Sequence, residues 1–228
     1  MLSAIIVAAG QGKRLNSALP KPLVKIGRSP VIIYSLSALD KHPLVNEIIV
    51  VVNPKNQPLI QRLIQGEAFK KIRCLVLGGK RRQDSVYNGL KNVSAKSEWV
   101  LIHDAARPFI DPGTITKVIA AARIHGAAIV AVKPKATIKF SKDDNLVAKT
   151  LDRDKLWEIQ TPQVFKKTLI LSAYKKYSVS KVTDDAALIE KLGQKVRLVQ
   201  GKYENIKITT AEDLLFAGLI AKRIAHAI

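Results

Sequence analysis

The stretch "WVLIHDAARPFI", residues 99–110, begins as an apolar strand and then places a histidine, an aspartate and an arginine within five positions. An ordinary exposed turn closed by Pro108 is one explanation. The other is that these polar residues lie at the carboxyl edge of a parallel sheet, where open α/β folds bind their ligands. The rest of the sequence decides between the two.

Short apolar runs alternate with amphipathic stretches along most of the chain. Continuous apolar strands separated by helices predict an α/β fold: a Rossmann-like, mostly parallel sheet with helices on both faces. We expect residues 1–228 to form a single domain. The periodicity predicts strands over 4–8, 47–52, 74–77, 99–103 and 127–132, and helices over 31–41, 57–65, 83–93 and 112–125, the last with Asp111 as its N-cap.

The pattern changes at residues 133–151, where two half-polar runs flank the turn Asp143-Asp144-Asn145. This predicts an inserted β-hairpin arm. Its alternating apolar residues would be exposed unless covered, and a twofold partner is the simplest cover, so we expect a homodimer. Beyond the arm we expect helices near 166–177 and 184–192, extended runs at 196–199 and 205–208, and a last helix with a capping box formed by Thr209 and Glu212.

The composition excludes several classes of protein. No apolar run approaches the ~18 residues of a membrane-spanning helix, Cys74 is the only cysteine, and the N-terminal segment lacks the basic region of a signal peptide. We therefore expect a soluble cytoplasmic protein with no membrane partner. The net charge of +20 permits a nucleic-acid partner or a polyanionic small substrate. The 5% of aromatic residues provide no evident stacking platform for single-stranded nucleic acid, but the charge alone identifies neither partner.

Two glycine-containing loops follow predicted strands. The first, "AAGQGKRLNSALPKPL" at residues 8–23, carries three cations, Arg14 and Lys21 among them, and matches neither the Walker loop nor the dinucleotide fingerprint. It suits a polyphosphate and a solvated basic loop about equally well. The second, "GGKRRQDSVYNGL" at residues 78–90, has two glycines before a helix with Ser85 in its first turn. That arrangement suits recognition of a ribose or a base edge, although Gly-Gly before a helix is often only a turn.

The opening stretch adds a third polar element at a predicted strand end. Arg107 could bind a phosphate through two hydrogen bonds, and Asp104 could place a divalent metal or a substrate hydroxyl. No second histidine stands at metal-ligand spacing, so no metal ligand is assigned beyond Asp104 as a candidate. We interpret His103 as a partly buried, hydrogen-bonded residue and not as a base, because no nearby Ser or Cys nucleophile requires one.

Taken together, these segments resemble the 2-C-methyl-D-erythritol 4-phosphate cytidylyltransferases of the non-mevalonate isoprenoid pathway. They follow the family's order over almost the whole chain. The sequence departs from the family at Pro22-Leu23, where a glutamine and an aromatic residue are usual, and at Ala136, where an aspartate usually precedes the threonine. The matching segments are "IIVAAGQGKR", Pro20-Lys21, "GGKRRQDSV", "HDAARPFI", "TLDRDKLWEIQTPQVF", "VTDDAALIE" and "ENIKITTAEDL".

The resemblance implies transfer of CMP from CTP to 2-C-methyl-D-erythritol 4-phosphate with release of pyrophosphate, and Mg²⁺ bound mainly through the CTP phosphates. It implies that the arm interlocks two subunits and brings Thr137 and Arg153 to the partner's site. Arg14, Lys21, Arg153 and Lys207 are the implied catalytic residues. The implied binding residues are Ala8, Ala9 and Gly10 at the triphosphate, Gly79 and Ser85 at the cytidine, Asp104, Ala105 and Arg107 on the substrate side, and Thr137, Arg153, Thr161, Thr183 and Lys207 at the methylerythritol phosphate.

Two other functions remain possible from the sequence. A ribitol-5-phosphate cytidylyltransferase shares much of this motif set, although the "VAAG" and "LW…QTPQ" segments favour the isoprenoid enzyme. A nucleic-acid-binding role would require a continuous basic face. The chemistry of nucleotidyl transfer suits a site without a nucleophile, because a phosphate monoester is already anionic and needs only positioning and charge neutralisation.

Overall fold

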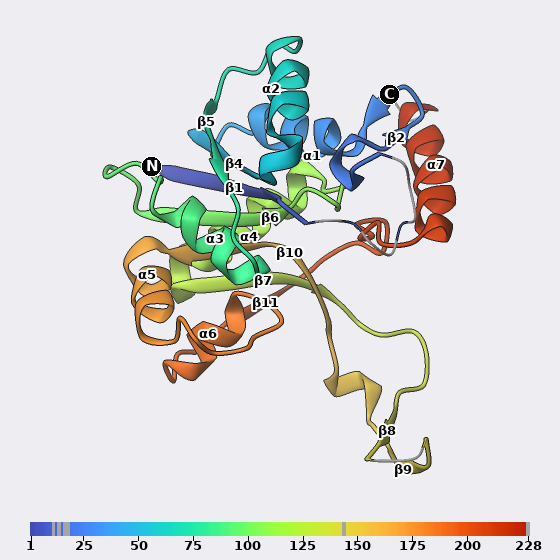
Figure 1. Cartoon of the computed structure of the whole chain (residues 1–228). Coiled ribbons are helices and arrows are strands. Elements are labelled where there is room, and N and C mark those ends of the chain that lie inside the picture. Colours follow the sequence, from blue (N-terminus) through green and yellow to red (C-terminus); the bar gives the residue numbers. More distant parts are fainter. Residues whose placement is uncertain (11, 13–14, 16–18, 143–144, 227–228) are drawn as a thin grey trace.

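A seven-stranded sheet forms the centre of the molecule (Figure 1). The computed structural model describes residues 1–10, 12, 15, 19–142 and 145–226. The strand order is β11-β7-β10-β6-β1-β4-β5, and β10 runs antiparallel to both of its neighbours while the other pairs are parallel. This confirms the Rossmann-like, mostly parallel sheet. The strands are β1 (Leu2–Ala8), β4 (Glu47–Val52), β5 (Ile72–Leu77), β6 (Trp99–Asp104), β7 (Ala127–Val132), β10 (Glu158–Lys166) and β11 (Arg197–Gln200).

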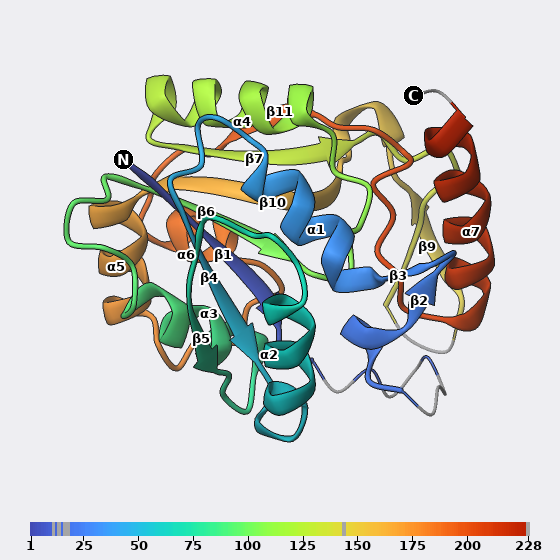
Figure 2. The ribbon, with the colours of Figure 1, turned by 90° about the horizontal axis from the view of Figure 1, so that it is seen from above.

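Helices cover both faces of this sheet, as the view from above shows (Figure 2). Helices α1, α2 and α4 pack against one face, which buries Ile6 and Val50, and α3, α5 and α6 pack against the other, which buries Ile5 and Val51. Side chains alternate along a strand, so a strand covered on both faces is apolar at nearly every position. The helices are α1 (Val31–Asp40), α2 (Gln57–Gln65), α3 (Arg82–Leu90), α4 (Pro112–His125), α5 (Lys167–Lys176), α6 (Ala186–Lys191) and α7 (Ala211–His226).

The order of the strands reverses at β1. From β1 the chain continues to β4 and β5 on one side and later crosses to β6 on the other side. The ends of β1 and β6 are in register, with Val7 opposite Asp104. The crevice outside such a reversal point is the usual ligand site of an open α/β sheet. The topology therefore brings the loop after Ala8 next to the polar residues that begin at His103.

The boundaries of several elements match the prediction, and one central strand was missed. Two strands and two helices have the predicted bounds: β4, β7, α2 and α4. The missed strand is β10, whose sequence "EIQTPQVFK" mixes polar residues with Pro162 and lacks an apolar run. Its pairing with β7 changes register between Ile159 and Gln163, which accommodates the proline that cannot donate to a regular ladder.

The predicted cap of the last helix was wrong by one residue. Asp213, and not Glu212, accepts hydrogen bonds from the backbone N–H groups of Thr209 (2.8 Å) and Thr210 (2.9 Å). Thr210 Oγ1 accepts from the backbone N–H of Asp213 at 3.4 Å. The reciprocal pair of a capping box is thus Thr210 with Asp213.

The predicted hairpin is present and extends away from the sheet (Figure 1). Strands β8 (Lys139–Ser141) and β9 (Val147–Thr150) pair antiparallel, and every residue in them is exposed. A short helix, η4 (Arg153–Lys155), leads from the arm back toward β10. In the part of the chain that the structure describes, no helix has the length and apolar character needed to span a membrane.

Candidate active site

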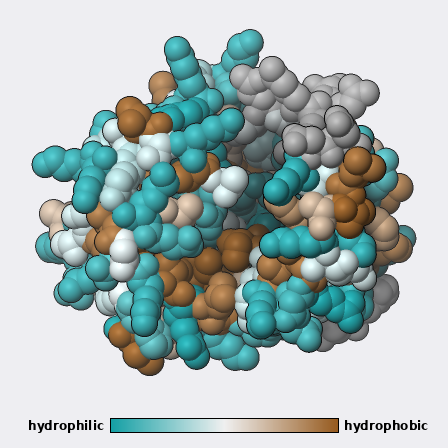
Figure 3. Space-filling model, turned by 90° about the horizontal axis from the view of Figure 1, so that it is seen from below, coloured by the Kyte–Doolittle hydropathy of each residue, from teal (hydrophilic) through white to brown (hydrophobic). Residues whose placement is uncertain are grey.

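A cleft of about 640 Å³ lies at the carboxyl edge of the sheet, where β1 and β6 end. Its walls come from the loop after β1, the short helix η2 (Lys21–Leu23), the loop before α3, and the segment before α7. The face of the molecule shown in Figure 3 is hollowed near its centre, with hydrophilic residues on one part of the rim and hydrophobic residues on another. The sequence-predicted residues that line the cleft are Ala8, Ala9, Gly10, Lys21, Gly79, Ser85, Asp104, Ala105 and Lys207.

The loop after β1 places backbone and a cation along one wall of the cleft. Gly12 has a φ of +66°, and a Cβ added to it would lie 3.0 Å from Lys21 Cβ, so a glycine there allows the loop to lie against Lys21. The half-buried Lys21 begins η2 and lines the cleft. Leu15 is buried in a small separate core. The predicted catalytic residue Arg14 lies outside the described residues.

The loop before α3 forms another part of the cleft wall and packs closely against the loop after β1. A Cβ on Gly78 would lie 2.3 Å from Ala9 Cβ, and one on Gly79 would lie 2.4 Å from Asp84 Cβ, so neither position has room for a side chain. Ser85 Oγ accepts a hydrogen bond from the Gly79 N–H (3.0 Å) and donates to the carbonyl oxygen of Arg81 (3.1 Å). The two residues that we expected at the cytidine are therefore bonded to each other and fix the shape of this loop.

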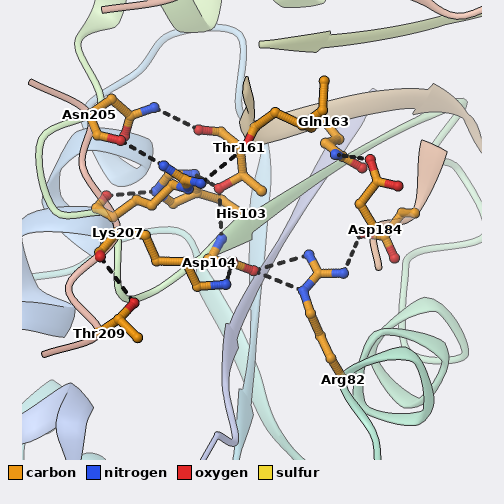
Figure 4. Close-up of polar contacts among 12 residues, drawn as sticks. Arg82, His103, Asp104, Thr161, Gln163, Asp184, Asn205, Lys207 and Thr209 are labelled. Carbon is orange, nitrogen blue, oxygen red and sulfur yellow. Dashed lines mark hydrogen bonds and ion pairs between the residues drawn. The ribbon is translucent and has the colours of Figure 1, made fainter. Parts of the chain in front are cut away.

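Asp104 is the centre of the polar network at the end of β6 (Figure 4). Its Oδ2 atom accepts from Lys207 Nζ at 2.6 Å, and its Oδ1 atom is 3.0 Å from Arg82 Nη2 and 3.1 Å from Arg82 Nε. Burial opposes ionisation of this carboxyl, but Arg82 and Lys207 hold the pKa of Asp104 well below its usual range. Asp104 is therefore an ionised carboxylate at any physiological pH.

His103 supports this network from below the cleft. The side chain is fully buried, its Nε2 donates to the carbonyl oxygen of Arg107 (3.0 Å), and its Nδ1 accepts from Thr161 Oγ1 (3.0 Å). Thr161 Oγ1 in turn accepts from the backbone N–H of Asp104 at 3.1 Å. Burial lowers the pKa of His103 to about 4, which keeps the ring neutral. The interpretation of His103 as a hydrogen-bonded residue is confirmed, and its burial is complete.

Five of the predicted substrate residues are not part of the cleft lining in the described chain, and one of them, Arg153, lies at the base of the arm. Arg107 donates from Nη1 to the carbonyl oxygen of Asn205 (2.8 Å) and from Nη2 to that of Ile159 (3.2 Å), so its guanidinium braces two backbone segments. Thr161 is buried beneath Asp104 and bonded as described above. The other two are Thr137, which is exposed on the arm, and Thr183, which is exposed before α6.

The catalytic residue predicted at the base of the arm, Arg153, also lies outside the cleft lining. It is exposed in η4, and its Nη1 donates to the carbonyl oxygen of Lys135 at 2.8 Å. The cleft and the arm of one chain thus hold separate parts of the predicted site.

Among the described residues, several cations and one carboxylate, Asp104, line the cleft. No group of three or more His, Cys, Asp or Glu side chains with metal-binding geometry occurs among the described residues. Both oxygens of Asp104 already pair with Arg82 and Lys207, although Asp104 itself is among the residues that line the cleft. The donor set fits a metal held mainly by the phosphates of a ligand, with Asp104 as an outer partner, and does not fit a metal held by protein side chains alone.

The sequence analysis missed Arg82 and the groups behind it. Arg82 Nη1 lies 2.8 Å from Asp185 Oδ2, and Asp185 Oδ1 accepts from the hydroxyl of Tyr174 at 2.5 Å. Burial lowers the pKa of Arg82, but Asp185 and Asp104 raise it by more, so the guanidinium stays charged. The signal was present in "GGKRRQDSV" and "VTDDAALIE", but nothing local in either segment indicates that they pair.

The chain is similar in sequence and in structure to members of one known family. A sequence model of the 2-C-methyl-D-erythritol 4-phosphate cytidylyltransferases matches residues 2–223. The chain is 45% identical to the enzyme of that name from Desulforamulus reducens, with 96% of this chain and 95% of the relative aligned, and 43% identical to that from Geobacillus thermodenitrificans, with 98% of each aligned. It is also similar to the solved structure of the 4-diphosphocytidyl-2C-methyl-D-erythritol synthase from Anaerococcus prevotii, with a TM-score of 0.86 at 39% identity over 97% of this chain and 98% of that one. The fold, the cleft and these relatives lead to one conclusion: the chain belongs to the 2-C-methyl-D-erythritol 4-phosphate cytidylyltransferase family.

Proposed function

We propose that this protein transfers CMP from CTP to 2-C-methyl-D-erythritol 4-phosphate and releases pyrophosphate, as the names of its relatives indicate for them. One observation carries the proposal. Lys21 from the first loop and Lys207 from the segment before α7 line the same cleft as Asp104 at the reversal point of the sheet. A site with cations on both sides suits the joining of two anionic substrates.

The wall formed by the loop after β1 is the proposed nucleotide half of the site. Backbone of Ala8, Ala9 and Gly10 would lie along the triphosphate, and Lys21 would neutralise charge that develops on the transferring phosphoryl group. The tight loop held by Gly79 and Ser85 would present its backbone to cytidine. Arg14 belongs to this half by resemblance alone.

The end of β6 is the proposed acceptor half. Lys207 would bind the phosphate of the methylerythritol phosphate while Asp104 holds the lysine in place. An oxygen of that phosphate attacks the α-phosphorus of CTP, the bond to the β-phosphate breaks, and pyrophosphate leaves. The attacking oxygen is already anionic, so the step needs no general base and the neutral His103 has no part in proton transfer.

Mg²⁺ is the proposed cofactor, held by the CTP phosphates with Asp104 nearby. When bound, it would supply positive charge that stabilises the triphosphate and the leaving pyrophosphate. Lys21 and the backbone of the first loop would orient the nucleotide in either case.

The arm is the proposed dimerisation element of a cytoplasmic homodimer. Exposed apolar side chains on it, with Leu146 at 73% and Val147 at 62% exposure, would be covered by a second copy. Thr137 and Arg153 would then complete the acceptor half of the partner's site, and Thr161, Thr183 and Arg107 would support that half from within each chain. This explains why Arg153 need not reach the cleft of its own chain.

Pyrophosphate release from CTP tests the proposal directly. We expect rapid release with 2-C-methyl-D-erythritol 4-phosphate and little with ribitol 5-phosphate, each assayed with Mg²⁺ and with excess chelator. Faster release with ribitol 5-phosphate would show that ribitol 5-phosphate, and not 2-C-methyl-D-erythritol 4-phosphate, is the acceptor. Absence of release with either acceptor would contradict cytidylyl transfer as the function.

A further inference from the structure

Arg82 lies between two carboxylates that come from distant parts of the chain. Its Nη1 pairs with Asp185 Oδ2 at 2.8 Å, and its Nε and Nη2 both lie near Asp104 Oδ1. Asp185 is only 1% exposed. A buried carboxylate is costly unless it is paired, so Asp185 needs both the Arg82 guanidinium and the Tyr174 hydroxyl that donates to it.

The position of Tyr174 gives this anchor rigidity. Its ring is 1% exposed and stacks on Tyr87, with ring centroids 5.6 Å apart and an angle of 1° between the planes. Tyr87 belongs to α3, the same helix that begins with Arg82. Arg82 is therefore fixed at its backbone by α3 and at its guanidinium by Asp185.

The same guanidinium determines how Asp104 presents its second oxygen. With Oδ1 held by Arg82 and the backbone N–H held by Thr161, Oδ2 is left to accept from Lys207 Nζ at 2.6 Å. Lys207 is 41% exposed along its side chain and would otherwise sample many rotamers.

We propose that Arg82, anchored by Asp185 and Tyr174, is a positioning residue that fixes the Asp104 carboxylate and thereby holds Lys207 at the cleft for the acceptor phosphate. The inference rests on the proposed function, since it assigns Lys207 to that phosphate. Arg82 also lines the cleft, but the positioning role requires no contact between Arg82 and either substrate.

Two conservative variants test this inference. Tyr174→Phe removes only the hydroxyl, and Asp185→Asn removes only the charge. We expect the KM for the acceptor phosphate to rise several-fold in Tyr174→Phe and about tenfold in Asp185→Asn, with the KM for CTP changed less than about twofold. Tyr177→Phe is the matched control, because its hydroxyl donates to the backbone of Lys191 at 2.7 Å and has no link to Arg82.

A double-mutant cycle separates positioning from general structural support. In a Lys207→Ala background, the added effect of Asp185→Asn or Tyr174→Phe on the acceptor KM should disappear, because there is no lysine left to position. An undiminished effect in that background, or an equal rise in both KM values, would overturn the inference. If Asp185→Asn fails to fold, Tyr174→Phe still decides the matter. An inactive wild-type enzyme would refute the proposed function, whereas an active one without this coupling refutes only the role of Arg82.

Discussion

The cleft between β1 and β6 and the arm that carries β8 and β9 differ in how their side chains are held. In the cleft, Asp104 is bonded through its backbone and both carboxylate oxygens to residues of the same chain. In the arm, both strands are exposed along their length. The cleft residues are packed and ion-paired within a single chain. We propose that the exposed arm depends for its function on a second copy of the chain.

The largest effect we expect comes from substituting Lys21 in the cleft. Lys21→Ala should lower turnover by on the order of a hundredfold or more, because it removes a cation where charge develops on the transferring phosphoryl group. Steady-state rates and a thermal melt of the same preparation are the measurements. A normally folded Lys21→Ala enzyme with near-native turnover would remove Lys21 from the mechanism.

The buried His103 beneath the cleft should make the stability of the protein depend on pH. Burial lowers the pKa of His103 from 6.5 to about 4, so between these values the unfolded chain binds a proton that the folded chain does not. The free energy of unfolding should therefore fall as the pH is lowered from 6.5 to about 4, with about 3 kcal/mol from His103. Above pH 6.5 His103 is neutral in both the folded and the unfolded chain, so the full stability is present. Below about pH 4 it is protonated in both, so His103 causes no further loss.

Denaturant unfolding at several pH values tests this expectation. His103→Gln should flatten the dependence in that window, and His125→Gln, at the exposed end of α4, is the matched control. Parallel curves for wild type and His103→Gln would show that His103 is not the group responsible.

The proposed shared role of the arm predicts recovery of activity in mixed dimers. Lys21→Ala has a lesion in the cleft and Arg153→Ala has one in the arm, so a mixed dimer would contain one site with both lesions and one with neither. Random exchange at equal concentrations should make about half of the dimers mixed and restore about a quarter of wild-type activity. Differently tagged subunits report the exchange. Confirmed exchange without recovery would place Arg153 in the site of its own chain.

A smaller effect than that of Lys21→Ala is expected at the acceptor side of the cleft. Lys207→Ala should raise the KM for the acceptor phosphate by roughly tenfold, as loss of one charge-assisted hydrogen bond does, and leave CTP binding largely intact. Calorimetric titration with CTP and steady-state kinetics with each substrate provide the comparison. A collapse of CTP affinity would mean that the nucleotide and acceptor halves have been exchanged in our assignment.

The local structure of the chain was largely predictable from its sequence. Helix α4 has the predicted Asp111 cap, which accepts from the Thr114 N–H at 3.1 Å, and it ends at Gly126 with a φ of 82°. The strand ends that carry Ala8, Gly79 and Asp104 were predicted because apolar runs stop abruptly there. These features depend on neighbours within a few residues, which a sequence displays directly.

The fold also contains elements that local pattern could not predict. Strand β10 lies in the middle of the sheet, yet its polar side chains are acceptable only because distant groups pair with them. Gln163 Nε2 donates to Asp184 Oδ2 at 2.8 Å, and Gln160 Nε2 donates to the carbonyl oxygen of Lys202 at 3.0 Å. Neither partner is apparent from the alternation of apolar and polar residues along β10.

The sequence by itself determined the fold class, the strand ends that form the cleft and the cation Lys21 after the first of them, and the family resemblance added Lys207. Only the tertiary structure decided that Arg82 pairs with Asp185, 103 residues away, and that Arg107 turns to the backbone of Asn205. The physical reason is that periodicity and capping report interactions along one element. Buried ion pairs are instead selected by the cost of leaving a charge unpaired, wherever in the chain the partner lies.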